Sequence, residues 1–201
     1  MKFPILTAVL VLCLVIALAN KRSKEYLAEE EDKFWERENA ANSTRRKSLD
    51  SLKLITIPLD ILPMNNYKDN NIIQSCIDTI VELSKSPIAN LTGISNTDLK
   101  LKYGAPNIDL LATYDSRYTT LASTLNKLGQ ALYDEGDIQA AKETLEFAVS
   151  TNTDISGTYR LLGDIYQSEG NAEGISGLIQ TVNALNTPMK PSIITYLESL
   201  I

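Results

Sequence analysis

An unbroken apolar stretch, Phe3–Ala19, opens the pattern of hydrophobic and polar positions, and a basic cluster at 21–24 follows at once. Its seventeen uncharged residues reach the lower limit for a helix that crosses about 30 Å of hydrocarbon. We therefore expect residues 1–20 to be a transmembrane anchor or a signal segment. Residues 17–19, Ala-Leu-Ala, have the small-x-small form of a signal-peptidase site, so secretion after cleavage following Ala19 is the alternative.

The charges on the two sides of the apolar stretch favour one orientation. Five basic residues fall within 21–37, whereas the other side has only Lys2 and the terminal amine. Because positively charged flanks stay in the cytoplasm, we expect a single-pass membrane protein with a cytoplasmic folded body.

A charged segment at 21–50 comes next. Its part 24–41 is rich in strong helix formers, with Leu27 and Phe34 seven positions apart. This pattern fits either a solvated helical stalk or one heptad of a coiled-coil seam. The polar, basic run NSTRRK at 42–47 is typical of a linker.

A second apolar strip, LKLITIPLDILPM at 52–64, lies within the segment 51–66. Its β-branched residues favour extended backbone, and Pro58 and Pro63 prevent a helix and exclude a central strand. Because exposed apolar strips are unfavourable in water, the strip either packs against its own domain or is kept for a partner.

Over 67–201 the apolar residues follow the period of a helix. An apolar residue at every third or fourth position predicts one amphipathic helix that begins near Asn70 and stops before Pro87. Glycine and proline in 90–106 predict a connecting loop, and a helix is expected again at 108–117.

The chain repeats itself at a fixed offset, so that 122–155 aligns with 156–189. The identities fall where a helical hairpin needs a small residue at a helix crossing, and a glycine before a capping Asp137 or Asn171. Two helical hairpins are therefore predicted, and the apolar residues of 190–201 predict a capping helix after them. The seven identical pairs are Thr124/Thr158, Leu128/Leu162, Gly129/Gly163, Glu135/Glu169, Gly136/Gly170, Asn152/Asn186 and Thr153/Thr187.

This period and its residue types resemble the tetratricopeptide repeat. The second unit departs from that pattern at Ile175, where a small residue is expected. The resemblance implies an all-α fold, in which an N-terminal transmembrane helix precedes a tetratricopeptide-like α-α superhelix of helical hairpins. The matching residues are Leu128, Gly129, Leu132, Gly136, Ala141, Leu145 and Ala148 in the first unit, and Tyr159, Leu162, Gly163, Tyr166 and Gly170 in the second.

Tetratricopeptide proteins hold an extended peptide or a partner helix in a groove lined by the first helix of each hairpin. The resemblance therefore implies a partner-binding groove with Tyr133 as its expected anchor. The residues expected to line this groove are Asn126, Gln130, Tyr133, Arg160, Asp164 and Gln167.

Four further stretches are similar to uncharacterised membrane-anchored proteins of Gram-positive anaerobic bacteria. They are FWERENAAN at 34–42, TRRKSLDSL at 44–52, ITIPLDILP at 55–63 and TGISNTDLKLKYG at 92–104. This similarity implies an anchored bacterial protein and assigns no activity to it.

The composition of the chain disfavours several classes of function. Residues 51–201 carry ten basic and seventeen acidic side chains, and such an acidic body repels nucleic acid. The chain has no histidine, which removes the usual general base and the commonest metal ligand. Its two cysteines give no disulfide framework. We expect neither enzymatic activity nor a cofactor or metal site.

These observations favour a membrane-tethered scaffold or adaptor that binds a protein or peptide through the groove. The alternative is a structural or self-associating envelope protein whose groove is filled by its own residues 52–64.

Overall fold

The computed structural model describes residues 3–63, 67 and 70–201, with side chains from Ala8 onward. The described residues are helical and contain no strand, which confirms the all-α prediction. They form two compact units, Met1–Lys47 with Ser95–Ile108, and Ser48–Ile94 with Asp109–Ile201. The elements are α1 (Phe3–Asn42), α2 (Asn71–Leu83), α3 (Asn96–Tyr103), a 3-10 turn η1 (Ala105–Asn107), α4 (Ile108–Asp134), α5 (Ile138–Ser150), α6 (Ser156–Ser168), α7 (Ala172–Ala184) and α8 (Lys190–Glu198).

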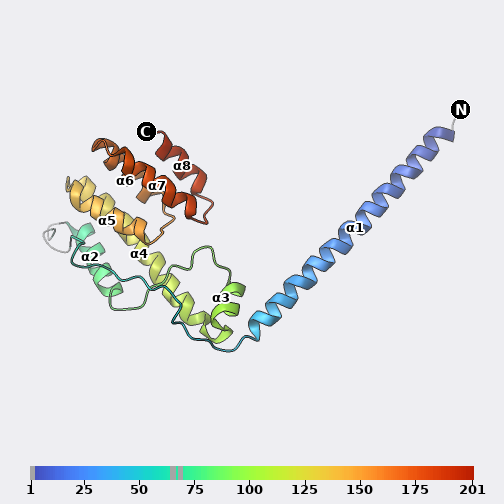
Figure 1. Ribbon diagram of the computed structural model, residues 1–201, viewed down its shortest axis with the longest axis horizontal. Coiled ribbons are helices and arrows are strands. Elements are labelled where there is room, and N and C mark those ends of the chain that lie inside the picture. The colour runs from blue at the N-terminus through green and yellow to red at the C-terminus, as the bar shows by residue number, and fades with distance from the viewer. Residues whose placement is uncertain (1–2, 64–66, 68–69) are drawn as a thin grey trace. The chain divides into compact units, whose positions relative to one another are not determined.

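The first unit contains the 40-residue helix α1, which joins the predicted anchor and stalk without a break (Figure 1). No glycine or proline follows Pro4 in this helix, and Pro4 lies in its first turn, where proline is tolerated. The side chains of residues 1–7, where the predicted anchor begins, lie outside the described part of the chain. Within the described part, no helix is both long and apolar enough to cross a membrane.

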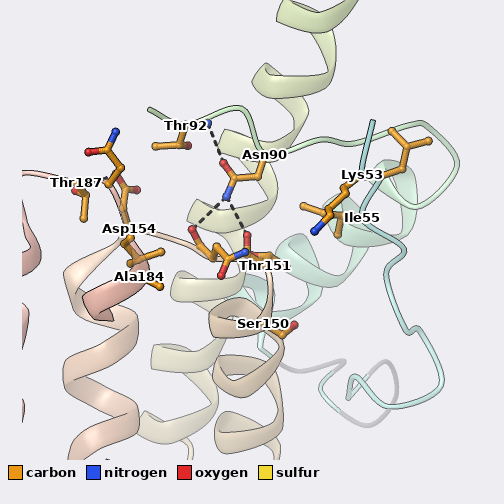
Figure 2. Close-up of a pocket in the computed structure, with 13 residues that line it drawn as sticks. Lys53, Ile55, Asn90, Thr92, Ser150, Thr151, Asp154, Ala184 and Thr187 are labelled. Atoms are coloured by element: carbon orange, nitrogen blue, oxygen red, sulfur yellow. Dashed lines mark hydrogen bonds between the residues drawn. The ribbon is translucent and has the colours of Figure 1, made fainter. Parts of the chain in front are cut away.

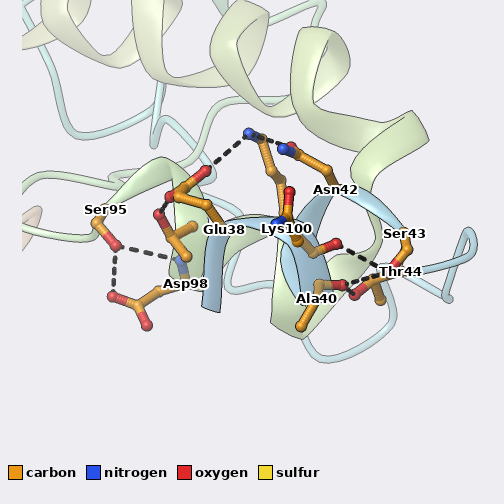
Figure 3. Close-up of polar contacts among 10 residues, drawn as sticks. Glu38, Ala40, Asn42, Ser43, Thr44, Ser95, Asp98 and Lys100 are labelled. Carbon is orange, nitrogen blue, oxygen red and sulfur yellow. Dashed lines mark hydrogen bonds and ion pairs between the residues drawn. The ribbon is translucent and has the colours of Figure 1, made fainter. Parts of the chain in front are cut away.

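The end of α1 packs against α3 (Figure 3). Ala41 is completely buried there, and polar side chains flank it on both helices. The Glu38 carboxylate accepts a hydrogen bond from the Thr97 hydroxyl and lies 3.7 Å from Lys100 Nζ. Since these groups are only partly exposed, the contact fixes how the two helices cross.

The segment at 42–47, interpreted from its polarity as a linker, is attached to this same corner. The amide of Ala105 donates to the Thr44 carbonyl, and the amide of Lys47 donates to the Tyr103 carbonyl, each over 3.0 Å. Gly104 lies at φ 93°, and a Cβ there would meet the Arg45 carbonyl oxygen. Only glycine permits this close approach, so the segment is an ordered part of the first unit.

The second unit is an α-helical repeat. The helices α5 and α7 have thirteen residues each, and their first residues, Ile138 and Ala172, are 34 positions apart. The helices α6 and α8 begin at the same spacing, at Ser156 and Lys190. Figure 1 shows α5, α6, α7 and α8 packed in succession. The period found in the sequence therefore extends to α8.

Each hairpin turns through the same backbone motif. Gly136 and Gly170 have positive φ angles of 84° and 67°, and each follows the last turn of a first helix. The residue after each glycine donates its amide to a carbonyl five positions earlier, over 3.0 Å from Asp137 and 2.8 Å from Asn171. This pattern is a Schellman motif, which ends one helix and places the next residue to begin another.

The same two residues, Asp137 and Asn171, then cap the second helices. Their side chains accept the amides of Ala140 and Gly174, over 3.0 and 2.8 Å. Asp137 also accepts a hydrogen bond from the Tyr67 hydroxyl. This bond, and to a smaller extent the one from the Ala140 amide, holds the pKa of the Asp137 carboxyl below its usual range. Burial and this same bond raise the pKa of Tyr67 to about 12, so its hydroxyl stays protonated as a donor.

The core of the second unit is one cluster that includes α2 and the strip at 52–64. Its fully buried side chains come from α2, α4, α5, α6, α7 and α8, at the positions that helical period predicts. Ile57 and Leu62 of the strip are buried in this cluster, and the Ile55 amide donates to the Ile88 carbonyl over 2.9 Å. The strip thus packs against its own domain through Ile57 and Leu62, while Leu54, Leu59 and Ile61 are exposed and Met64 lies outside the described residues.

Replacement of Asp137 by asparagine tests the charge of the first cap. Because its folded-state pKa is lowered, Asp137 stabilises the fold above the unfolded pKa of about 4, and this stabilisation is lost as the pH falls through the folded pKa. Asparagine caps a helix about as well as aspartate but does not titrate there. We expect D137N to narrow the difference between the thermal midpoints at pH 7 and pH 3, measured by circular dichroism. An unchanged difference would contradict this role.

Candidate functional site

The six residues predicted to line a groove lie on the first helices of the two hairpins. Asn126, Gln130 and Tyr133 are in α4, and Arg160, Asp164 and Gln167 are in α6. Within each helix they are spaced by four and then three positions, which places them on one side. We call this surface of α4 and α6 the first-helix face. Gln130, Tyr133, Arg160 and Gln167 are exposed on it, while Asn126 and Asp164 are half-buried.

On α6, all three predicted residues contact α8 or the residues after it. The Arg160 guanidinium donates to the Ser192 hydroxyl over 3.1 Å. The Tyr196 hydroxyl donates to the Asp164 carboxylate over 2.6 Å, a bond that together with burial raises the pKa of Tyr196. Gln167 donates to the carbonyl of Leu200 over 3.2 Å. These side chains therefore hold the chain's own following helix.

The same contact occurs one repeat earlier. The Thr158 hydroxyl donates to the Asn126 side-chain carbonyl over 3.2 Å. A shift of 34 positions converts Asn126 into Arg160 and Thr158 into Ser192. Successive first helices therefore stack through equivalent residues, and α8 occupies the position of the first helix of a third unit.

A shallow hollow of about 480 Å³ lies where α6 meets α8. The Arg160 guanidinium carbon is 5.0 Å from the centre of the Tyr196 ring, which fixes the cation over an aromatic face. A guanidinium surrounded by hydroxyls is suited to donate hydrogen bonds to a carboxylate or a peptide carbonyl. The residues that line the hollow are Arg160, Pro191, Ser192, Thr195, Tyr196 and Ser199.

The α4 part of the first-helix face is more open. The Gln130 side chain donates to Asp134 of its own helix over 2.9 Å, so it makes a local contact only. Tyr133 is 38% exposed, and this aromatic ring is available at the surface. The predicted anchor is therefore placed where a partner could reach it.

A second concavity, of about 540 Å³, lies at the end of the repeat helices where the chain turns from α5 to α6 and from α7 to α8 (Figure 2). The turns α5–α6 and α7–α8 contribute to it together with the strip and the loop after α2. Seven of its thirteen lining residues carry an amide or a hydroxyl, four are apolar, and the remaining two supply one cation and one carboxylate. The residues are Lys53, Leu54, Ile55, Asn90, Thr92, Ser150, Thr151, Asn152, Asp154, Ala184, Leu185, Asn186 and Thr187.

The α5–α6 turn beside this pocket is held from three sides. The Asn90 amide donates to the carbonyls of Thr151 and Asn152, over 2.9 and 3.1 Å (Figure 2). The buried hydroxyls of Tyr118 and Tyr159 donate to carbonyls of the same turn. Burial raises the pKa of both tyrosines, so both remain donors at neutral pH. These hydrogen bonds therefore hold the α5–α6 turn in place at the side of the pocket.

The cysteines and acidic side chains of the described residues are the candidates for metal or thiol chemistry. No group of three or more cysteine, aspartate or glutamate side chains could hold a metal ion among those residues. Cys76 is buried, and burial raises the pKa of its thiol, which disfavours the reactive thiolate.

Sequence reasoning missed the polar pocket and the partners on α8. The pairs Asn152/Asn186 and Thr153/Thr187 are visible as identities in the repeat, but nothing in the sequence brings them together with Asn90. Ser192 could have been found by extending the repeat offset once more from Thr158.

Comparison of the chain with models of protein families, with curated proteins and with solved structures finds no match. The functional argument therefore rests on the chemistry and geometry of the residues described above.

Proposed function

We propose that this protein is a scaffold that binds a protein or peptide partner on the first-helix face of a tetratricopeptide-like domain. The observation that carries the proposal is the stacking contact that recurs from one unit to the next, first as Asn126–Thr158 and then as Arg160–Ser192. Such stacking builds a continuous surface from successive first helices, on which each unit adds equivalent side chains. Tyr133 and the Arg160 hollow offer an aromatic anchor and a cation, two side-chain types enriched in binding hot spots.

The chemistry of the surface supports a polypeptide ligand. Glutamine, tyrosine and arginine side chains can pair with peptide groups and with a carboxylate. The net negative charge of residues 51–201 disfavours nucleic acid as the partner.

The double variant Tyr133→Ala/Arg160→Ala tests the surface. We expect partner capture from extracted membranes to fall at least about tenfold, because both hot-spot groups are removed. Quantitative mass spectrometry of the captured proteins measures this loss.

The matched control is Gln139→Ala, an exposed position on the second helix α5, which should leave capture unchanged. Since Arg160 also stacks against Ser192, circular dichroism must show that the double variant remains folded. Unchanged capture by a folded double variant argues against this surface.

We also propose that α1 tethers the scaffold to a membrane as a single-pass anchor, with the folded body in the cytoplasm. The support is the uncharged run Phe3–Ala19, followed by basic residues. Eight large apolar side chains between Val9 and Leu18 are each 50–61% exposed, an arrangement that needs a non-aqueous environment. The alternative is secretion after cleavage following Ala19.

Intact mass of the protein extracted from membranes distinguishes these two outcomes. A retained anchor gives the full 22.2 kDa chain. A shorter product that begins at Asn20 would reject the anchor, because the apolar run would have been removed.

A structural or self-associating role is the second candidate, and the strip at 52–64 is the observation that favours it. Ile57 and Leu62 are buried in the core, so the strip contributes to stability. The described contacts of the strip are with the core and with Ile88, so they support a structural role of the strip and give no support to its filling the groove.

The double variant Ile57→Ala/Leu62→Ala measures this contribution. Each truncation of a buried branched side chain costs about 2–5 kcal/mol, so the urea midpoint should fall clearly. Leu54→Ala, at a side chain that is 53% exposed in the same strip, is the control and should change it little. A strip that is dispensable for stability would give equal midpoints for both variants.

A further inference from the structure

The charged half of α1 exposes four large side chains within its own unit. Tyr26, Leu27, Phe34 and Trp35 are 63, 61, 56 and 55% exposed. Phe34 and Trp35 contact each other edge to face, with ring centres 5.3 Å apart. Tyr26, nine positions before Trp35, lies on the opposite side of the helix. A free helix gains nothing from exposing apolar groups in water, so the cluster of Leu27, Phe34 and Trp35, which we call the α1 patch, requires an explanation.

The α1 patch continues a face of α1 that already makes a protein contact. At 100° per residue, Leu27, Phe34 and Ala41 follow one another at seven-residue spacing and lie within about 40° on one side of the helix. Ala41 is completely buried at the end of α1 that packs against α3, where Figure 3 shows the Glu38 contacts. The same stripe is therefore buried at its end and uncovered at Phe34 and Leu27.

A bilayer is a poor cover for this patch. On the proposed anchoring, Phe34 lies fifteen residues beyond Ala19, which is about 22 Å along a helix that rises 1.5 Å per residue. The headgroup region extends only about 5–8 Å beyond the hydrocarbon. The acidic tract Glu29–Asp32 would also be repelled by anionic lipid.

A second parallel copy is also a poor cover. Residues 25–38 contain seven acidic and two basic side chains. Lys33 is already paired with Glu29 and Glu30, over 2.8 and 3.4 Å. Two copies anchored side by side would bring acidic tracts against each other, and like charges at close range are unfavourable. Charge complementarity favours a cationic partner.

We propose that residues 25–38 of α1 form a docking site for a cationic amphipathic helix of a partner protein. Its apolar side would cover Leu27, Phe34 and Trp35, while its lysines or arginines would face the acidic tract. The Trp35 indole donates to Glu31 over 3.4 Å, so an apolar ring and an acidic group meet at this point of the helix. Helix-on-helix recognition of this type combines apolar anchors with charged flanks.

Trp35 is the only tryptophan of the chain, so its fluorescence reports directly on this site. The experiment uses the full chain in nanodiscs of zwitterionic lipid. The probe is an eighteen-residue peptide of leucine and lysine arranged as an amphipathic helix. An isomer of the same composition, with its leucines distributed around the helix, is the matched peptide control.

We expect the amphipathic peptide to shift Trp35 emission to shorter wavelength and to saturate. Phe34→Ala should weaken binding about tenfold, because it removes the central ring while keeping a strong helix former. Neutralising Glu29–Asp32 to the amides should weaken it and remove its salt dependence. Ile72→Ala, at a similarly exposed apolar side chain on α2, should leave binding unchanged.

Several outcomes would overturn the proposal. Equal binding of the isomeric peptide, or no effect of Phe34→Ala, would show that charge alone accounts for peptide binding and that the apolar patch does not contribute. A shift on adding lipid vesicles without peptide would assign the patch to a bilayer. A shift that follows protein concentration, with a doubled mass in sedimentation, would assign it to a second copy.

The outcome is separable from that of the proposed scaffold function. Tyr133→Ala/Arg160→Ala should leave this titration unchanged, whether or not it abolishes capture on the first-helix face. Failure at the α1 patch would likewise leave the first-helix face untouched.

Discussion

The stacking of one first helix on the next is the interaction on which the second unit depends. A helical hairpin cannot bury both of its apolar sides by itself, so each unit relies on its neighbour for its core. Leu125, Leu162 and Ile193 are fully buried in that shared core. The hydrogen bonds from Thr158 to Asn126 and from Arg160 to Ser192 then fix the register in which the helices meet. The arrangement of the first-helix face follows from this register.

Features determined by neighbouring residues could be predicted from the sequence. Gly136 and Gly170 are expected at helix ends, and Asp137 and Asn171 at helix starts, because positive φ angles and side-chain caps depend on local chemistry. The apolar period likewise identifies α2, since Ile73 and Ile80 must both face the core. These parts of the fold follow from residue type and spacing alone.

Features that depend on distant segments could not be predicted in the same way. A polar residue between two stacked helices, such as Arg160, has the same sequence pattern as an exposed residue, and only the position of Ser192 distinguishes them. The polar pocket needs four segments to meet, and Asn90 has no local signal for its contact with Thr151. The run at 42–47 is polar enough to suggest a linker, yet backbone hydrogen bonds to the α3 corner order it.

Because α8 takes the place of a further first helix, the number of repeat units before it can change. Because α8 begins one full repeat after α6, a second copy of the block 156–189 inserted after Ile155 would carry the same turn and cap residues, and its Thr158 would again face Asn126. The first-helix face would thus be lengthened by one unit, with Asp164 of the inserted copy facing Leu162 of the next unit in place of Tyr196.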